Sequence, residues 1–248
     1  MKKAVISCIA LLTLSAQASG SPPSTEELLD RVDDLYRGKS SEGQMTMTIT
    51  TEYWQRTLAL DFWSEGNDKS LLKIKSPKKE KGTATLMVKR DVWNFLPKVK
   101  RVIKVPSSMM GASWMGSHLT NDDLVKRNRM SKDYNAKITC SGVRSGVNIY
   151  EVTCIAKDDA TVVWGKVVVE IGQKDRIPRT IQYFDEDMVL SRTMLFSNIQ
   201  AIGNDLLPMT FKVSEVDRPG ESTEMTYKRL AFGVKHPANF FSLRRLQH

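Results

Sequence analysis

The sequence predicts a mostly antiparallel β-sheet protein that is exported from the cytoplasm. Most of the chain alternates between apolar and polar residues with the period of two that is typical of strands, whereas one clear segment near the N-terminus has helical periodicity. Short turn sequences separate the strand-like runs, without the crossover helices that a parallel sheet requires. The first residues have the pattern of a secretory signal.

The N-terminal segment predicts export. Lys2 and Lys3 precede an apolar run from residue 4 to 14, and residues 16–18 (Ala-Gln-Ala) have the small-x-small pattern of a signal-peptidase site. We therefore predict a signal peptide over residues 1–18. The apolar run is shorter than the ~20 residues of a spanning helix. Cys8 lies inside it rather than at the cleavage site, which argues against a lipoprotein.

Residues 19–248 are predicted to form one domain, since no Pro/Ser-rich linker and no internal repeat divides them. The whole chain has a net charge of +9, and removal of two signal lysines leaves about +7. An exported protein rarely meets nucleic acid, so the basic balance indicates an anionic membrane surface, an acidic partner, or solubility alone. The positive charges are scattered, with small clusters at Lys78, Lys79 and Lys81 and at Lys98, Lys100 and Arg101.

Two cysteines, Cys140 and Cys154, remain after the signal. Both lie in strand-like runs, joined by a turn around residues 144–146, and an even count in an exported protein favours a disulfide. We predict a bridge within one hairpin; the alternative is two buried free thiols. The three histidines have no partner at a zinc-site spacing, so we expect neither a metal nor another cofactor.

One helix is predicted near the beginning of the domain. Ser24 is a suitable N-cap, Glu27 completes a capping box, and Gly38 follows the last apolar residue. The apolar residues at helical spacing are Leu28, Leu29, Val32, Leu35 and Tyr36. Because only one face is apolar, this helix is expected to lie on an apolar surface.

About a dozen strands are predicted after the helix. The clearest alternation is in residues 45–50 and 54–62. The further runs are SLLKIKS, ATLMVKR, VWNFLP, RVIKVP, NAKITC, VNIYEVTCIAK, TVVWGKVVVEI, PRTIQYFD, MVLSRTMLFSNI, LPMTFKVSEV, TEMTYKRLAF and NFFSLRRL.

Residues 106–124 interrupt this strand pattern. The segment is rich in Met, Gly and Ser, and we expect Met109, Met110, Trp114 and Met115 to cluster on one side of a short helical element. Thr120 or Asn121 is expected to cap a second short helix. Composition alone favours a helix packed permanently into the core. The alternative is a movable lid over an apolar cavity, because methionine side chains adapt to irregular partners.

The run from Gly82 to Leu124 resembles the LolA-like outer-membrane lipoprotein-sorting proteins. That family has an aromatic-aromatic-Leu-Pro strand, a basic strand, a Met/Ser-rich stretch, and a small-residue Met-Gly-Ser element before an acidic Asp-Leu. The ending FFSLRRL is similar to the family's closing strand, and the likeness extends over residues 19–248. The matching residues are Trp93, Phe95, Leu96, Pro97, Arg101, Val102, Trp114, Met115, Gly116, Ser117, Asp123 and Leu124.

The resemblance implies a curved, incomplete antiparallel β-barrel with helices that cover its concave face. It also implies a periplasmic carrier or chaperone that holds lipid or lipoprotein acyl chains in an apolar cavity and delivers them towards the outer membrane. Some members act with inner-membrane lipid exporters of the RND/MMPL type. The lid-locking arginine of the lipoprotein carrier has no residue-by-residue match; Arg56 is a candidate because it alternates with inward apolar residues.

A non-enzymatic carrier is therefore the leading hypothesis, and an accessory subunit of an RND/MMPL-type exporter is the alternative. Ser117 and His118 with a nearby aspartate suggest a hydrolase, but adjacent side chains point apart and no GxSxG elbow is present. We expect transient contact with a membrane surface and no binding of nucleic acid. The residues expected to line the ligand cavity are Met45, Met47, Trp54, Leu58, Leu60, Phe62, Trp93, Phe95, Met109, Met110, Trp114 and Met115.

Overall fold

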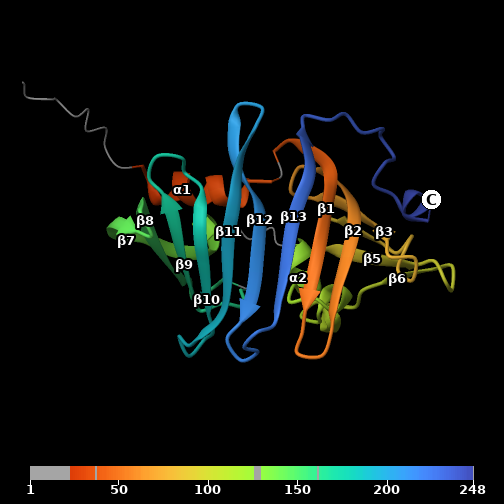
Figure 1. Ribbon diagram of the computed structural model, residues 1–248, viewed down its shortest axis with the longest axis horizontal. Coiled ribbons are helices and arrows are strands. Elements are labelled where there is room, and N and C mark those ends of the chain that lie inside the picture. The colour runs from red at the N-terminus through yellow and green to blue at the C-terminus, as the bar shows by residue number, and fades with distance from the viewer. Residues whose placement is uncertain (1–22, 37, 126–129, 161, 248) are drawn as a thin grey trace, which may run out of the picture.

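A computed structural model describes residues 23–36, 38–125, 130–160 and 162–247. It contains one 13-stranded sheet in the order β6-β5-β4-β3-β2-β1-β13-β12-β11-β10-β9-β8-β7. The sheet does not close, because β6 and β7 are its two edges. Strands at both ends are turned across the central ones (Figure 1). The predicted class, a curved and incomplete antiparallel barrel, is confirmed.

Two meanders build the sheet, and the antiparallel pairing of β1 with β13 joins them. The strands are Ser40–Thr50 (β1), Gln55–Glu65 (β2), Lys69–Ser76 (β3), Ala84–Val88 (β4), Asp91–Leu96 (β5), Arg101–Lys104 (β6), Tyr134–Arg144 (β7), Val147–Ala156 (β8), Lys166–Gly172 (β9), Pro178–Phe184 (β10), Leu190–Ile202 (β11), Asp205–Glu215 (β12) and Ser222–Phe232 (β13). The helical elements are Thr25–Asp33 (α1), Ser107–Met109 (η1), Trp114–Gly116 (η2), Asn121–Val125 (α2), Met130–Asp133 (α3) and Leu243–Leu246 (α4).

The connection between the two meanders has a topological role. It leaves the sheet at the edge strand β6 and re-enters at the opposite edge strand β7. A chain that joins opposite edges must cross one face of the sheet, and this one crosses the concave face. Residues 106–125 of the connection, here called the cover segment, carry η1, η2 and α2. Topology thus places the irregular segment of the sequence over the hollow of the sheet.

Strand alternation separates the two faces of the sheet. In β2, Leu58, Leu60 and Phe62 are buried while the residues between them are more exposed, as expected for successive side chains that point to opposite faces. Met47 pairs with Leu58 and Met45 with Leu60, so β1 and β2 contribute one continuous apolar surface. This surface belongs to the largest apolar core, on the concave side.

Helix α1 begins as predicted. The Glu27 backbone N–H donates to Ser24 Oγ at 3.1 Å. Leu28, Leu29 and Val32 are buried in a second apolar core, which they share with β8, β9 and β10. The helix ends at Asp33, earlier than the predicted stop at Gly38. Its apolar face therefore covers the concave side at the other end of the sheet from the cover segment.

The C-terminal residues form a strap rather than the predicted closing strand. Residues 236–247, here called the C-terminal strap, contain only turns and α4, which Ser242 caps by accepting from the Arg245 N–H at 3.3 Å. Phe240, Phe241 and Leu246 pack on the convex face of β2 to β5. Strands β2 to β5 already have a hydrogen-bonded neighbour on each side, so the strap cannot join them as a further strand. Its apolar residues are buried by packing on the face of the sheet instead.

The predicted disulfide between Cys140 and Cys154 is wrong; both cysteines are free. The hairpin does form, but its register pairs Cys140 with Glu151 and Cys154 with Ala136. An offset of three residues is about 10 Å along a strand, beyond the ~7 Å Cα separation that a disulfide spans. The thiols also face different surroundings, since Cys140 is exposed and Cys154 buried. Burial, with a smaller contribution from Asp33, raises the pKa of Cys154 to about 12.

Some predictions concern regions that the structure does not describe or elements that are shorter than expected. The signal peptide over residues 1–18 lies outside the described residues. Within the described ranges, no helix has the length and apolar character needed to cross a membrane. The run TVVWGKVVVEI is a strand only from Lys166 onward, as β9.

Candidate functional site: an apolar cavity under the cover segment

A large cavity lies between the concave face of the sheet, α1 and the cover segment. Its volume is about 1320 Å³. Most of its lining is apolar and comes from both meanders. The apolar lining residues include Leu35, Met45, Phe62, Leu72, Met110, Trp114, Leu119, Leu124, Val162, Trp164, Val167, Ile181, Met194, Phe196, Phe211, Met225 and Tyr227. Charged residues also line it: Asp33, Asp91, Asp122, Asp123, Asp133, Asp159, Arg90 and Arg192. A concave space that combines apolar walls with placed polar groups is typical of a small-molecule or lipid site.

Aromatic rings form one continuous wall of this cavity. The ring of Tyr227 lies 5.4 Å from that of Phe62 and 4.7 Å from that of Tyr36, measured between centroids. Tyr36 is 6.1 Å from Phe211, which in turn is 6.2 Å from Phe196. The Tyr36 hydroxyl donates to the Pro208 carbonyl, and burial raises the pKa of this phenol. The wall therefore offers ring surface, with the Tyr36 hydroxyl already hydrogen-bonded, which suits an apolar guest.

A nearly buried ion pair lies among the charged residues of the cavity lining. The Arg192 guanidinium on β11 forms a bidentate pair with the Asp123 carboxylate on α2, at 2.9 and 3.0 Å. Both side chains are nearly buried, and the guanidinium also lies 4.8 Å from the centroid of Tyr183 and 5.4 Å from that of Trp164. Burial opposes the charged form of Arg192, but the hydrogen bonds and charge of Asp123 outweigh it, so its pKa is raised.

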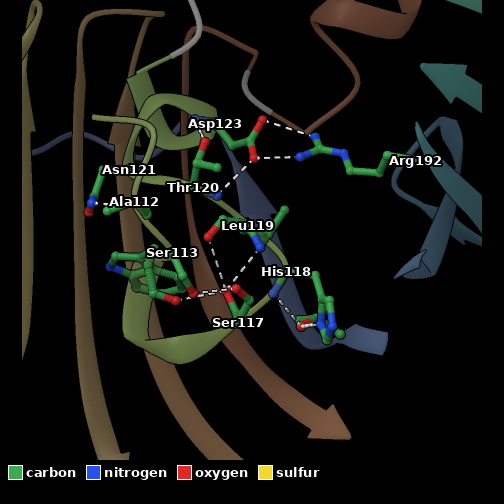
Figure 2. A network of polar contacts seen from close by, with 11 residues as sticks. Ala112, Ser113, Ser117, His118, Leu119, Thr120, Asn121, Asp123 and Arg192 are labelled. Atoms are coloured by element: carbon green, nitrogen blue, oxygen red, sulfur yellow. Dashed lines mark hydrogen bonds and ion pairs between the residues drawn. The ribbon is translucent and has the colours of Figure 1, made fainter. Parts of the chain in front are cut away.

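The cover segment folds through its own polar contacts (Figure 2). Thr120 caps α2 in a reciprocal capping box: the Asp123 N–H donates to Thr120 Oγ1 at 3.1 Å, and the Thr120 N–H donates to the Asp123 carboxylate at 2.9 Å. The Asn121 amide donates to the carbonyls of Met109 and Ala112, both at 3.1 Å. These bonds hold two separate 3-10 turns, where one short helical element was predicted, and the second short helix, α2, which was predicted.

Trp114 is the apolar anchor of the cover segment. Its side chain is 2% exposed and belongs to the concave core. Its indole N–H donates to Thr85 Oγ1 on β4 at 3.0 Å, so even the polar atom of the ring has a partner in the sheet. A buried tryptophan held in this way fixes the segment over the cavity.

Polar contacts tie the cover segment to two more strands. The Arg56 guanidinium on β2 donates to the Met115 carbonyl, and its Nη1 lies 3.4 Å from Glu80. On the other side, the His118 N–H donates to Thr223 Oγ1 on β13 at 2.9 Å, and the His118 ring Nδ1 lies 2.9 Å from the same oxygen. With the contacts of Arg192 on β11 and Thr85 on β4, the segment is held by side chains from four strands. Arg56, the candidate suggested by alternation, does contact the cover segment.

A family model described as an uncharacterized protein matches residues 66–248. The chain belongs to this family. No curated protein sequence matches it.

Three solved structures share the fold. A protein from Vibrio parahaemolyticus described as an outer-membrane lipoprotein-sorting domain is 22% identical, with a TM-score of 0.77 over 90% of this chain and 98% of that one. A DUF1329 family protein from Desulfovibrio piger is 20% identical, with a TM-score of 0.80 over 89% and 97%. A LolA superfamily protein from Nitrosomonas europaea is 19% identical, with a TM-score of 0.72 over 89% and 98%. At these identities the likeness establishes the fold, and the resemblance to LolA-like proteins is confirmed at that level.

The structure brings four of the predicted cavity residues together. Met45, Phe62, Met110 and Trp114 all line the cavity. Their contribution to ligand binding stays a prediction.

The other predicted residues lie elsewhere. Met47, Leu58 and Leu60 are fully buried in the core beneath the cavity, and Met115 packs against that core. Trp54 is exposed beside the β1–β2 turn, and Met109 is exposed on η1. Trp93 and Phe95 lie under the C-terminal strap on the convex face. Alternation within their own strand does not show which face of the sheet is hollow, and a part for these two residues in ligand binding stays a prediction.

Several cavity residues were missed by the sequence analysis. Met194 and Phe196 on β11, Phe211 on β12, and Met225 and Tyr227 on β13 all line the cavity. Within β11 and β13 the pairs are two residues apart, as for one face of a strand. Aromatic and Met residues at this spacing in neighbouring late strands were the available signal.

The residues that resemble a hydrolase site have other partners in the structure. Ser117 Oγ donates to the Trp114 carbonyl at 2.7 Å and accepts the Leu119 N–H at 3.1 Å. The His118 ring faces Thr223, and Asp123 pairs with Arg192. These groups shape and attach the cover segment rather than aligning a nucleophile with a base.

Proposed function

We propose that the protein is a periplasmic, non-enzymatic carrier that holds the acyl chains of a lipid or lipoprotein in the cavity under the cover segment and delivers them towards the outer membrane. The observation that carries this proposal is the cavity of about 1320 Å³, with largely apolar walls, beneath a segment held by exchangeable polar bonds. Each buried methylene contributes about 0.8 kcal/mol, so part of a lipid tail gives useful affinity.

Entry and release follow from how the cover segment is held. Its attachments to Arg56, Thr85, Arg192 and Thr223 are hydrogen bonds or ion pairs whose groups accept water when they separate. Trp114 and Leu119 occupy space at the cavity. In this proposal an acyl chain displaces these side chains when it enters, and their return expels the chain at the destination. The segment therefore acts as the lid that the sequence offered as its alternative interpretation.

The direct test is identification of lipids that co-purify with the protein from its own periplasm. The proposal predicts an acyl species in near-stoichiometric amount by mass spectrometry. An environment-sensitive apolar dye should also bind saturably and be displaced by phospholipid or by an acylated peptide. A protein that carries no lipid and binds no dye at micromolar concentration would contradict the proposal.

A pair of neighbouring substitutions locates the site. Met194→Trp fills the cavity, because Met194 lines it, and should weaken dye binding by more than about 10-fold through steric exclusion. The matched control is Leu195→Trp, since the next side chain on β11 is exposed on the other face of the sheet. The control should bind dye as the unmodified protein does. Equal affinities in the two variants would place the dye outside the cavity.

A further inference from the structure

Two turns that are separate in the sequence form one corner of the molecule, near the β6 edge. The β3–β4 turn (residues 77–83) and the β5–β6 turn (residues 97–100) lie at the same end of paired strands, since Ala84 pairs with Phe95. They are also in close contact: a Cβ placed at Gly82 would lie 3.5 Å from the Cβ of Pro97. We call these two turns, with Arg101, the cationic corner.

The charge of this corner is strongly one-sided. It carries six exposed cations, and among the described residues none of the six forms an ion pair. They are Lys78, Lys79, Lys81, Lys98, Lys100 and Arg101. The one acid in the two turns, Glu80, points inward to Arg56. Nearby, the pKa of Lys73 is lowered, first by burial and then by the positive charges of Arg245 and Lys75.

Exposed apolar residues accompany these cations. Val99, at the tip of the β5–β6 turn, is 57% exposed, and Leu96 at the end of β5 is also exposed. Lys98 and Lys100 flank Val99 directly. An apolar tip between lysines is a pattern that suits a membrane surface, because the apolar side chain enters the headgroup region while the ammonium groups stay among the phosphates.

We propose that the cationic corner docks the protein on an anionic lipid surface. Five of the six cations are lysines, which act as separate point charges rather than as the planar forks that pair with carboxylates on a specific protein partner. Basic residues close to an anionic bilayer each contribute to binding, and a cluster of this size is sufficient for reversible attachment. The inference rests on the proposed carrier function only for its biological purpose, because a lipid carrier must contact membranes to load and unload.

The docking corner lies next to one attachment of the cover segment. The turn that presents Lys79 and Lys81 to solvent presents Glu80 inward, where it pairs with Arg56, and Arg56 holds the Met115 carbonyl. A headgroup phosphate that draws this turn outward acts directly on that attachment. Docking at this corner therefore brings the lid and the membrane surface together.

Flotation or sedimentation with lipid vesicles tests the proposal. The protein should bind vesicles that contain phosphatidylglycerol and should not bind vesicles of phosphatidylcholine alone. Binding should weaken as the salt concentration increases. The test variant replaces Lys78, Lys79, Lys81, Lys98 and Lys100 with Gln. Its affinity for the anionic vesicles should fall by about 100-fold.

A matched control removes the same number of charges elsewhere. It replaces five exposed lysines outside the cationic corner with Gln: Lys132, Lys137, Lys174, Lys228 and Lys235. The two variants have equal net charge, so the control should bind the vesicles at least 10-fold more tightly than the test variant. Equal affinities would show that net charge alone is responsible and would overturn the proposal. A wild-type protein that ignores anionic vesicles would also overturn it and would favour an acidic protein partner.

Dye binding separates this inference from the carrier function. The five-lysine variant should bind the apolar dye as tightly as wild type, because none of its changes lines the cavity. One outcome is that the variant loses vesicle binding while neither wild type nor the variant binds the dye. This outcome would support docking and contradict the carrier function. The opposite outcome is that dye binding is normal while the test and control variants bind the vesicles with equal affinity. This outcome would support the carrier function and contradict docking at the cationic corner.

Discussion

The cover segment and the C-terminal strap lie on opposite faces of the same half of the sheet, and they are held in different ways. The strap packs through rings: the centroid of Phe240 lies 5.7 Å from that of Trp63 and 5.2 Å from that of Phe241. The cover segment depends on hydrogen bonds and ion pairs to four strands, with Trp114 as its buried anchor.

The two kinds of contact differ in the free energy that their separation costs. Aromatic packing is lost to water at a net cost, because the rings gain nothing in exchange. Polar attachments lose less, since water replaces the bonds that are broken. We therefore expect the strap to stay on the convex face when a ligand binds, whereas the proposed lid function requires the cover segment to move. The cavity lies on the concave face, between the sheet, α1 and the cover segment.

The largest expected effect is on Trp114. Trp114→Ala should lower the free energy of unfolding by about 3–5 kcal/mol without ligand, because it removes a buried ring from the core. With a saturating apolar ligand this cost should shrink, since the ligand displaces the ring. Denaturant unfolding with and without ligand measures both values.

Trp93→Ala is the control for this prediction, because Trp93 lies on the convex face under the strap. Its cost should be the same with and without ligand. If the cost of Trp114→Ala were equally insensitive to ligand, the cover segment would be permanent core.

A smaller effect is expected at the strap. Leu246 is 1% exposed, so Leu246→Ala should cost about 2–4 kcal/mol through lost burial and a cavity. Dye affinity should stay within about two-fold of wild type, because the strap does not touch the cavity. Thermal unfolding and dye titration on the same sample give both quantities. A large change in dye affinity would mean that the two faces are coupled.

Arg56→Met should loosen the cover segment selectively. It removes a charge-assisted bond to the Met115 carbonyl and the pair with Glu80, worth about 1.5–3 kcal/mol. Hydrogen exchange of amides in the cover segment should accelerate by about 10-fold or more, while amides in β12 stay protected. Glu80→Gln separates the two contacts, because it leaves the Met115 bond in place. Uniform acceleration across the sheet would indicate general destabilisation instead.

The smallest effect is expected at Thr85. Thr85→Val deprives the Trp114 indole N–H of its acceptor, removes the bond that the Thr85 hydroxyl donates to Asn94 Oδ1, and should cost about 1–2 kcal/mol. Thr85→Ser keeps the hydroxyl and should preserve most of the stability. Comparison of the two variants by denaturant unfolding separates the hydrogen bonds of the Thr85 hydroxyl from the packing of the methyl group. Equal costs for Val and Ser would assign the effect to packing.

Several elements are specified by local chemistry and can be predicted from the amino-acid sequence. The capping pair of Ser24 and Glu27 placed α1, alternation in residues 45–62 placed β1 and β2, and Thr120 was correctly expected among the caps of α2. The break at residues 106–124 was also visible, because its composition suits neither a strand nor an ordinary loop. These features depend on neighbouring residues only, so periodicity and capping rules find them.

Only the tertiary structure decided which faces and partners these elements receive. Alternation shows that the strand carrying Trp93 has one apolar face. The curvature of the sheet decides that this face is convex and lies under the strap. Register decides that Cys140 and Cys154 stay apart, and the order of the strands decides that the chain from β6 to β7 crosses the hollow. Pairing, register and curvature arise from contacts between residues far apart in the chain, and a local pattern does not encode them.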